Sequence, residues 1–228
     1  MGGQTVPSIF VIEGPPRRLA PRGVFSPSQS VNKKNGENWC QCYLADRTLF
    51  ELLEKCDSDL AQNCRQAGCL HCSGPLHRSD YKRKPRGGPE VPDPIYRDSF
   101  CCAQDGCRKR HTPPSVRFLG RRVYWGIVVV LVSAMRHGLK PERVQTLRQS
   151  LGIDGRTLER WRQWWLEVFV QTAFWKAARA RFTPLLCEKT LPWSLGQAFE
   201  MKRRDRLLDL LKFLSPLTTA SVPWDGRF

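Results

Sequence analysis

The chain has 228 residues, of which 41% are hydrophobic; this is enough for one core or two small ones and excludes wholesale disorder. Lysine and arginine number 37 against 21 acidic residues, so the formal net charge is +16. A surface this basic attracts polyanions, with DNA, RNA and anionic lipid as the candidates. The longest apolar stretch, residues 123–135, is too short to span a bilayer and predicts a buried helix. We expect a cytoplasmic, nucleoid-associated protein.

Residues 1–45 predict a flexible tail. They contain scattered Gly, Ser and Arg without a sustained apolar period, and prolines at positions 7, 15, 16, 21 and 27. Their longest apolar run, residues 9–12, is much shorter than the core of a secretion signal. In a reducing cytosol, clustered cysteines indicate metal ligands before disulfides.

Residues 46–118 predict a leading helix followed by a small β module. The helix is expected at 46–66, where apolar residues recur at spacings of three and four. Residues 68–118 are rich in Gly, Pro, Arg and Cys and have no helical period. Short strands are expected at 76–81, 96–102 and 115–119, with a loop rich in proline and glycine at 85–94.

Two short-spaced cysteine pairs lie in this β module. Cys69 and Cys72 form a CxxC pair, and Cys102 and Cys107 form a second pair, each with a glycine close to its second cysteine. Two such pairs separated by a loop are typical of a zinc ribbon, in which each pair occupies a tight turn and a structural Zn²⁺ joins four sulfurs in a tetrahedron. A fragment with so few apolar residues would obtain most of its folding free energy from the metal.

The third ligand has an adjacent competitor. We favour Cys102 over Cys101 because Cys102 shares a strand face with Phe100, whose ring can pack beneath the turn. The residues that could substitute as ligands are His71, His77, His111 and Cys64. The other cysteines are expected to be ordinary small interior residues: Cys40, Cys42, Cys56 and Cys187.

Residues 119–215 predict a helical domain, followed by a tail at 216–228. Helices are expected near 121–137, 141–151, 155–171, 173–181 and 203–214. The second and third of these helices form a predicted helix-turn-helix, in which Gly152 ends the first helix and Asp154 caps the next. Ile153 and Leu158 would pack across that cap as a hydrophobic staple. The predicted fold class is mainly α with a small β zinc ribbon, followed by a helical helix-turn-helix domain.

The outward face of the second helix of this motif carries candidate base contacts. Arg156, Arg160 and Gln163 recur at helical spacing, and Thr157 near the start of the helix suits a phosphate or base contact. An ordinary helical hairpin with a charged outer face is the alternative. A second basic group near the cysteines is expected either to contact phosphates or to be a solvated surface: Lys82, Arg83, Lys84, Arg86, Arg108, Lys109 and Arg110.

Three stretches of the chain carry a resemblance to a known group of proteins: CLHCSGPLHRSDYKRKPRGG, SFCCAQDGCRKRHTPPSVRFLGRRVY and LGIDGRTLERWRQWW. In them the sequence resembles bacterial proteins that are encoded in or beside insertion sequences and are often described as transposase-related. Those proteins pair a zinc ribbon with a helix-turn-helix. The resemblance covers residues 46–215 and implies a DNA-binding role linked to mobile elements. It does not imply catalysis.

The sequence contains no recognisable active-site motif. Transposases of the carboxylate type need three acids that hold two metal ions, whereas the acids here are scattered over predicted helix surfaces. Tyr96 and Tyr124 are conceivable recombinase nucleophiles, but nothing clusters around them except basic residues. We expect a non-catalytic accessory or regulatory protein of a mobile element that binds double-stranded DNA. The alternatives are a transposase subunit or degenerate transposase acting with a catalytic partner, and a ribbon that binds RNA or protein.

Overall fold

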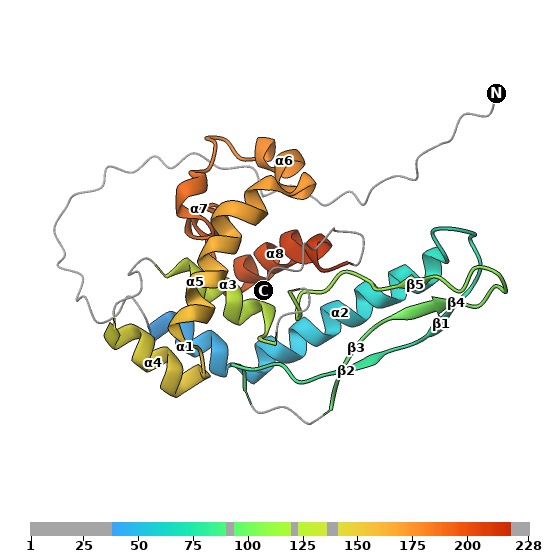
Figure 1. Ribbon diagram of the computed structural model, residues 1–228, viewed down its shortest axis with the longest axis horizontal. Helices are drawn as coiled ribbons and strands as arrows, with labels where there is room; N and C mark the ends of the chain where they lie inside the picture. Colours follow the sequence, from blue (N-terminus) through green and yellow to red (C-terminus); the bar gives the residue numbers. More distant parts are fainter. Residues whose placement is uncertain (1–37, 90–93, 120–122, 136–140, 220–228) are drawn as a thin grey trace.

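The computed structural model describes residues 38–89, 94–119, 123–135 and 141–219. This part of the chain is mainly helical with a small antiparallel β module, in agreement with the coarse fold class expected from the sequence. Figure 1 shows most of the helices gathered at one end and the strands at the other, with the long helix α2 (Arg47–Ala67) running from the helical end along the strands. Residues 1–37 of the predicted tail lie outside the described residues. Among the described helices, none combines the length and apolar character that crossing a membrane requires.

Helix α2 (Arg47–Ala67) confirms the helix expected at 46–66. Asp46 caps its start, because the Asp46 carboxylate accepts a hydrogen bond from the Leu49 amide at 3.1 Å. Gly68, with φ of 74°, ends the helix and leads the chain into the first cysteine pair. The buried face of α2 follows spacings of three and four and comprises Leu49, Phe50, Leu53, Asp57 and Ala61.

A further helix, α1 (Asn38–Ala45), precedes α2 and corrects the expectation of a tail that extends to residue 45. Leu44 is buried in the main core, and α1 packs against α3 (Gly126–Ala134). The Tyr43 hydroxyl donates a hydrogen bond to the Lys202 carbonyl. These contacts reach residues that are far away in sequence, so the local pattern of residues 38–45 does not reveal them.

The β module consists of two antiparallel sheets. One has the strand order β1-β4-β5 and the other pairs β2 with β3. The predicted strands at 76–81 and 96–102 are each split in two, near a point where the Asp80 carboxylate accepts from the Ser99 amide at 3.0 Å. The strand expected at 115–119 is reduced to one isolated bridge between Phe118 and Trp125. The strands are β1 (Leu76–Arg78), β2 (Tyr81–Arg83), β3 (Ile95–Arg97), β4 (Phe100–Cys102) and β5 (Arg110–His111).

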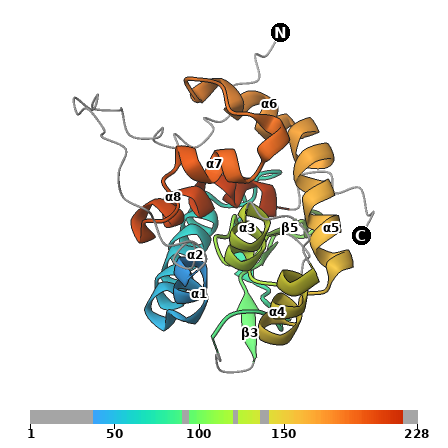
Figure 2. The same cartoon turned by 90° about the vertical axis from the view of Figure 1, so that its left-hand side faces the viewer.

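The helical end is built around α3, which lies among the other helices in Figure 2. The structure confirms the helices expected at 141–151, 155–171, 173–181 and 203–214. The helix at 155–171 ends in a π-turn and a 3₁₀-turn, and the helix at 173–181 ends in a 3₁₀-turn. Leu217, within the predicted C-terminal tail, is buried in a 3₁₀-turn, so the fold extends past residue 215. The sequence did not predict the helix at Trp193–Ala198, labelled α7. The remaining helices are α4 (Pro141–Leu151), α5 (Gly155–Gln163), α6 (Ala173–Ala178), α7 (Trp193–Ala198) and α8 (Arg204–Leu214), with shorter turns at Trp164–Val168, Phe169–Gln171, Arg179–Arg181, Glu188–Thr190 and Ser215–Thr218.

Two hydrophobic clusters make up the interior, and α2 contributes to both. Leu49, Phe50 and Leu53 on its first half belong to the large cluster of the helical end. Ala61 on its second half belongs to a much smaller cluster with Cys69, Leu76, Phe100 and Cys102. The β module therefore has little apolar surface of its own to bury.

A buried carboxylate joins the two parts. Asp57 on α2 is 1% exposed and accepts hydrogen bonds from the Ser115 hydroxyl at 2.5 Å and the Val116 amide at 2.7 Å. It also forms an ion pair with Arg117, whose Nε lies 2.9 Å away. Buried charges are tolerated when they are paired and hydrogen-bonded, and Asp57 meets both conditions.

Arg117 extends this network to the strands. Its guanidinium also pairs with Glu54 at 3.2 Å and Asp98 at 3.6 Å, and donates to the Tyr96 carbonyl at 3.3 Å. The guanidinium therefore links α2 to β3 and to the turn that follows it. This network explains why residues 115–119 do not form a strand, since Asp57 binds the polar groups at the start of that segment.

Replacing Asp57 with Asn should destabilise the protein by about 3 kcal/mol, because the buried Arg117 would lose its closest counter-charge. The loss is not larger because Glu54 and Asp98 would still pair with Arg117. Urea unfolding followed by circular dichroism measures the change. Asp59→Asn is the matched control, since Asp59 is exposed on the same helix and its replacement should change stability by less than about 0.5 kcal/mol. Equal unfolding midpoints for the two variants would contradict the role assigned to Asp57.

Candidate metal centre

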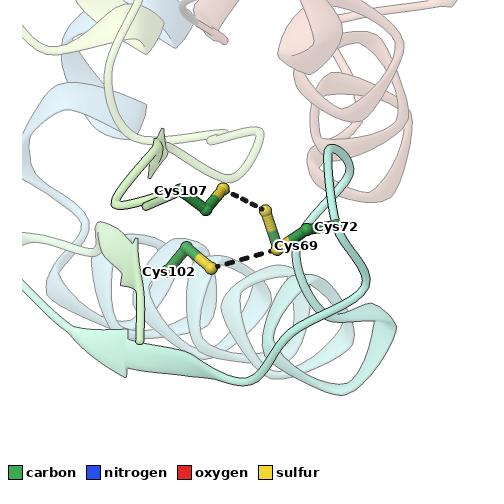
Figure 3. Close-up of side chains that lie close together, drawn as sticks. All are labelled: Cys69, Cys72, Cys102 and Cys107. Carbon is green, nitrogen blue, oxygen red and sulfur yellow. Dashed lines mark hydrogen bonds between the residues drawn. The ribbon is translucent and has the colours of Figure 1, made fainter. Parts of the chain in front are cut away.

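The structure brings Cys69, Cys72, Cys102 and Cys107 together, and their four sulfur atoms all lie within 4.8 Å of one another. Figure 3 shows the first two cysteines, from the loop after α2, facing the other two, from β4 and the turn that follows it. The Cys69 and Cys107 sulfurs are 3.6 Å apart, and those of Cys72 and Cys102 are 3.4 Å apart. A tetrahedral site with metal–sulfur bonds of ~2.3 Å has edges of ~3.8 Å, so the cluster has the size that such a site requires.

The register of β4 selects Cys102 over Cys101, as expected from its alternation with Phe100. Phe100 and Cys102 are buried, and the Cys102 sulfur joins the cluster. Cys101 points to the other side of the strand, where its thiol donates to the Arg108 carbonyl at 3.3 Å. Because successive residues of a strand alternate sides, the two adjacent cysteines cannot both reach the cluster.

Both cysteine turns present backbone amides to sulfur. The His71 amide donates to the Cys69 sulfur, and the Gln104 amide donates to the Cys102 sulfur, each at 3.4 Å. In each pair, therefore, the first cysteine accepts from the amide two residues later. The residue after each second cysteine adopts a left-handed conformation, with φ of 56° at Ser73 and 45° at Arg108. The two turns thus reverse the chain in the same way, although neither left-handed residue is glycine.

The two glycines noted in the sequence have different roles. A Cβ atom at Gly74 would lie 3.3 Å from the Cys72 sulfur and 3.4 Å from the Cys102 sulfur, so the missing side chain leaves room for the cluster. Gly106 has φ of 85°, and a Cβ atom added there would meet nothing within 4 Å, so its contribution is conformational.

His111 is a buried neighbour of the cluster. Its Nε2 lies 3.2 Å from the Cys69 sulfur, close enough to donate a hydrogen bond to the thiolate. His111 pairs with Phe100 across β4 and β5, which places it on the buried face of the sheet that Phe100 and Cys102 share. The sequence suggested His111 as a substitute ligand, whereas the four sulfurs already form a complete set. Of the other substitutes, His71 and His77 are exposed and Cys64 packs beside the small cluster.

The thiols have contrasting proton affinities. Burial raises the pKa of Cys69, but hydrogen bonds from the His71 and Cys72 amides, from His111 and from Cys107 outweigh it and lower that pKa to about 5. Burial raises the pKa of Cys102 to about 12. In this cluster Cys69 favours the thiolate form and Cys102 favours the protonated thiol, so the four cysteines do not readily all become thiolates by themselves. A bound cation would remove that repulsion, since metal binding releases thiol protons.

The candidate base contacts all lie on α5. Arg156, Arg160 and Gln163 are exposed on the side opposite the buried Trp161. Thr157 does not lie on this outward face, because it is only 8% exposed and its hydroxyl accepts from the Arg160 guanidinium at 3.1 Å. Thr157 lies four residues before Trp161, so it shares the buried face of the helix.

The basic residues near the cysteines are not equivalent. Arg83 is half-buried and stacks over the Phe118 ring at 5.4 Å, and Arg110 donates to the Ser79 hydroxyl at 3.0 Å. Arg108 pairs with Asp105 at 2.6 Å. The most exposed members of the group are Lys82, Lys84, Arg86, Arg108, Lys109 and Arg110.

Of the two tyrosines considered as nucleophiles, Tyr124 is 6% exposed and its hydroxyl donates to the Gly152 carbonyl at 2.7 Å, which makes it a packing residue. Tyr96 is 47% exposed on β3.

No protein-family model, curated protein or solved structure matches the chain. The function is therefore inferred from these residues and their geometry.

The purified protein should contain one metal ion for each chain, bound by the four cysteines. Cys102→Ser should abolish that content, because a hydroxyl replaces a buried thiolate ligand, whereas Cys101→Ser should retain it. Elemental analysis of both variants measures this difference. A chelator should also increase amide exchange in residues 69–89 and 94–111 and leave α3 protected, since the small cluster depends on the metal more than the large one does. Loss of metal from both variants would contradict the ligand assignment.

Proposed function

We propose that the metal is zinc and that the cysteine module is a zinc ribbon with a structural role. Four sulfurs at tetrahedral separations form a closed site of the kind that Zn²⁺ occupies in structural centres. Four protein ligands leave no position for substrate or water, so a structural role fits better than a catalytic one. The small size of the surrounding apolar cluster supports the same view, because the module needs an additional source of stability.

We further propose that α4 and α5 act as a helix-turn-helix that binds double-stranded DNA. Gly152, with φ of 65°, ends α4, and the Asp154 carboxylate accepts from the Thr157 amide at 2.6 Å to start α5. Ile153 and Leu158 are both buried on either side of this cap. The angle between the two helices is therefore fixed by a glycine, a cap and an apolar pair.

The observation that carries this proposal is the division of α5 into an anchored face and an exposed polar face that carries two arginines. Trp161 packs edge-on against Tyr124 at 5.2 Å between ring centroids, which holds the inner face against the core. Arg156, Arg160 and Gln163 occupy the outer face. A rigid helix that presents two arginines and a glutamine to solvent has the groups needed to contact guanine, adenine and phosphate in a major groove.

The hydrogen bond between Arg160 and Thr157 favours base reading by Arg160 in particular. The Thr157 hydroxyl accepts from the Arg160 guanidinium, so this long side chain is oriented before it meets DNA. An oriented side chain loses less conformational entropy on binding than a free one. Exposed Lys82, Lys84, Arg86 and Lys109 would add contacts to phosphates that do not depend on sequence.

We infer from these features that the protein is a non-catalytic DNA-binding accessory or regulatory protein. Its resemblance to insertion-sequence proteins supports a role in a mobile element, in the cytoplasm and near the nucleoid. A transposase or another protein of the same element is the protein partner that this role implies.

Selection of bound sites from random duplex DNA tests this function. The wild-type protein should enrich a defined sequence, and Arg156→Ala with Arg160→Ala should lose that preference, with affinity for the selected site reduced about tenfold to a hundredfold. Arg162→Ala is the matched control, because Arg162 is exposed on the same helix outside this face. An equal loss in the control, or no enriched sequence with the wild type, would contradict base reading by α5.

A further inference from the structure

The hairpin formed by β2 and β3 has an outward row of cations. Lys82, Lys84 and Arg86 are exposed, and the residues between them are half-buried. Successive side chains of an extended chain point to opposite sides, so these three share one side at intervals of about 6.6 Å. That interval is comparable to the separation of successive phosphates on an extended nucleic-acid strand.

The backbone of this row is held in place. Pro85 restricts Lys84 to an extended conformation. The Arg86 amide donates to the Val123 carbonyl at 2.7 Å, and the Arg86 carbonyl accepts from the Trp125 amide at 3.2 Å. These hydrogen bonds fix the end of the row to the segment that enters α3, so the backbone that sets the spacing of the three cations is held in place.

An exposed aromatic ring accompanies the cations. Tyr96 lies directly opposite Lys82 in the register of the hairpin, which places both on the same face. The Tyr96 backbone is fixed by its hydrogen bond from Arg117. Tyr81 belongs to the other face, where it pairs with the buried Arg97.

A groove of about 590 Å³ lies beside Tyr96, between the hairpin and α2. Apolar side chains and charged side chains of both signs line the groove, with Arg47 and Glu51 on the α2 side. Two other acids of the groove, Glu54 and Asp98, lie within ion-pair distance of Arg117, and Asp98 also pairs with Arg78 at 3.2 Å. The apolar lining comprises Phe50, Pro89, Pro94, Ile95 and Trp125.

We propose that this hairpin binds an unpaired strand of DNA, with one base stacked on Tyr96 in the groove and successive phosphates at Lys82, Lys84 and Arg86. The face of a base is available to an aromatic ring when the strand is single, whereas in a duplex that face is covered by the neighbouring bases. The combination of a basic track and an exposed ring therefore fits a single strand better than a duplex. The site is separate from α5, so each of the two can fail without the other.

Binding of a labelled oligothymidylate of about 12 nucleotides to the full chain, followed by fluorescence anisotropy, tests the proposal. Tyr96→Ala should weaken binding about tenfold or more, and Tyr96→Phe should restore it because the ring is kept. Lys82→Ala with Lys84→Ala should reduce the slope of log affinity against log salt by about 1.4, or about 0.7 for each phosphate contact. Tyr81→Ala, on the opposite face, is the matched control and should retain the wild-type affinity.

The α5 variants separate this site from the proposed duplex site. Arg156→Ala with Arg160→Ala should leave the affinity for oligothymidylate unchanged. If these substitutions abolish it, or if Tyr96→Ala binds oligothymidylate like the wild type, the hairpin assignment is overturned. If unlabelled oligouridylate displaces the probe at lower concentration than unlabelled oligothymidylate, the assignment to DNA is overturned.

Photo-crosslinking gives a readout that does not depend on the folding of a variant. The wild-type protein irradiated with an oligonucleotide containing bromodeoxyuridine should form an adduct in the peptide that contains Tyr96, as mapped by mass spectrometry. Adducts confined to α5 would overturn the proposal and leave the duplex function intact.

Discussion

The pair formed by Asp57 and Arg117 is the interaction on which the arrangement of this protein depends. A buried carboxylate must find a counter-charge and hydrogen-bond donors, and Asp57 finds them in Arg117, Ser115 and Val116. Arg117 then reaches the Tyr96 carbonyl on β3. Because neither charge can be left alone in the interior, α2, β3 and the start of segment 115–119 have one favourable mutual arrangement. The hairpin that carries Tyr96 and Lys82 takes its position from this pair.

The cysteine cluster and the Asp57 network stabilise the β module in complementary ways. The module's own apolar cluster is small, so it lacks the buried area that stabilises the helical end. A metal ion bound by four sulfurs would fix the two cysteine turns relative to each other, and the hydrogen bond between His111 and Cys69 would stabilise one thiolate. The ion pairs of Arg117 fix the opposite end of the module against α2. One linkage acts within the module and the other between the module and the helices.

Local patterns in the sequence were sufficient for most of the helices and for the cysteines, but not for α1 and α7. The cap at Asp154, the apolar pair around it and the spacing of Cys69 with Cys72 are features of a few adjacent residues, and the alternation of Phe100 and Cys102 identified the third cysteine. Contacts between distant residues were not visible. Asp57 looks like a surface acid in a helix until Arg117, 60 residues later, is placed beside it. The burial of Leu44 and the loss of the strand at 115–119 depend on partners equally remote. Thr157 is buried because it lies four residues before Trp161, on the same face of α5.

The two proposed nucleic-acid surfaces differ in their chemistry, and the difference follows from secondary structure. On α5, the acidic Glu159 is exposed on the same turn of helix as Arg156 and Arg160, so the outer face mixes both charges. Such a face is poor for phosphates alone and better suited to base edges, which present donors and acceptors together. On the hairpin, an extended chain places cations at every second residue and an aromatic ring across from one of them. That pattern matches a repeating backbone and the face of a base, which are the features of a single strand that do not depend on its sequence.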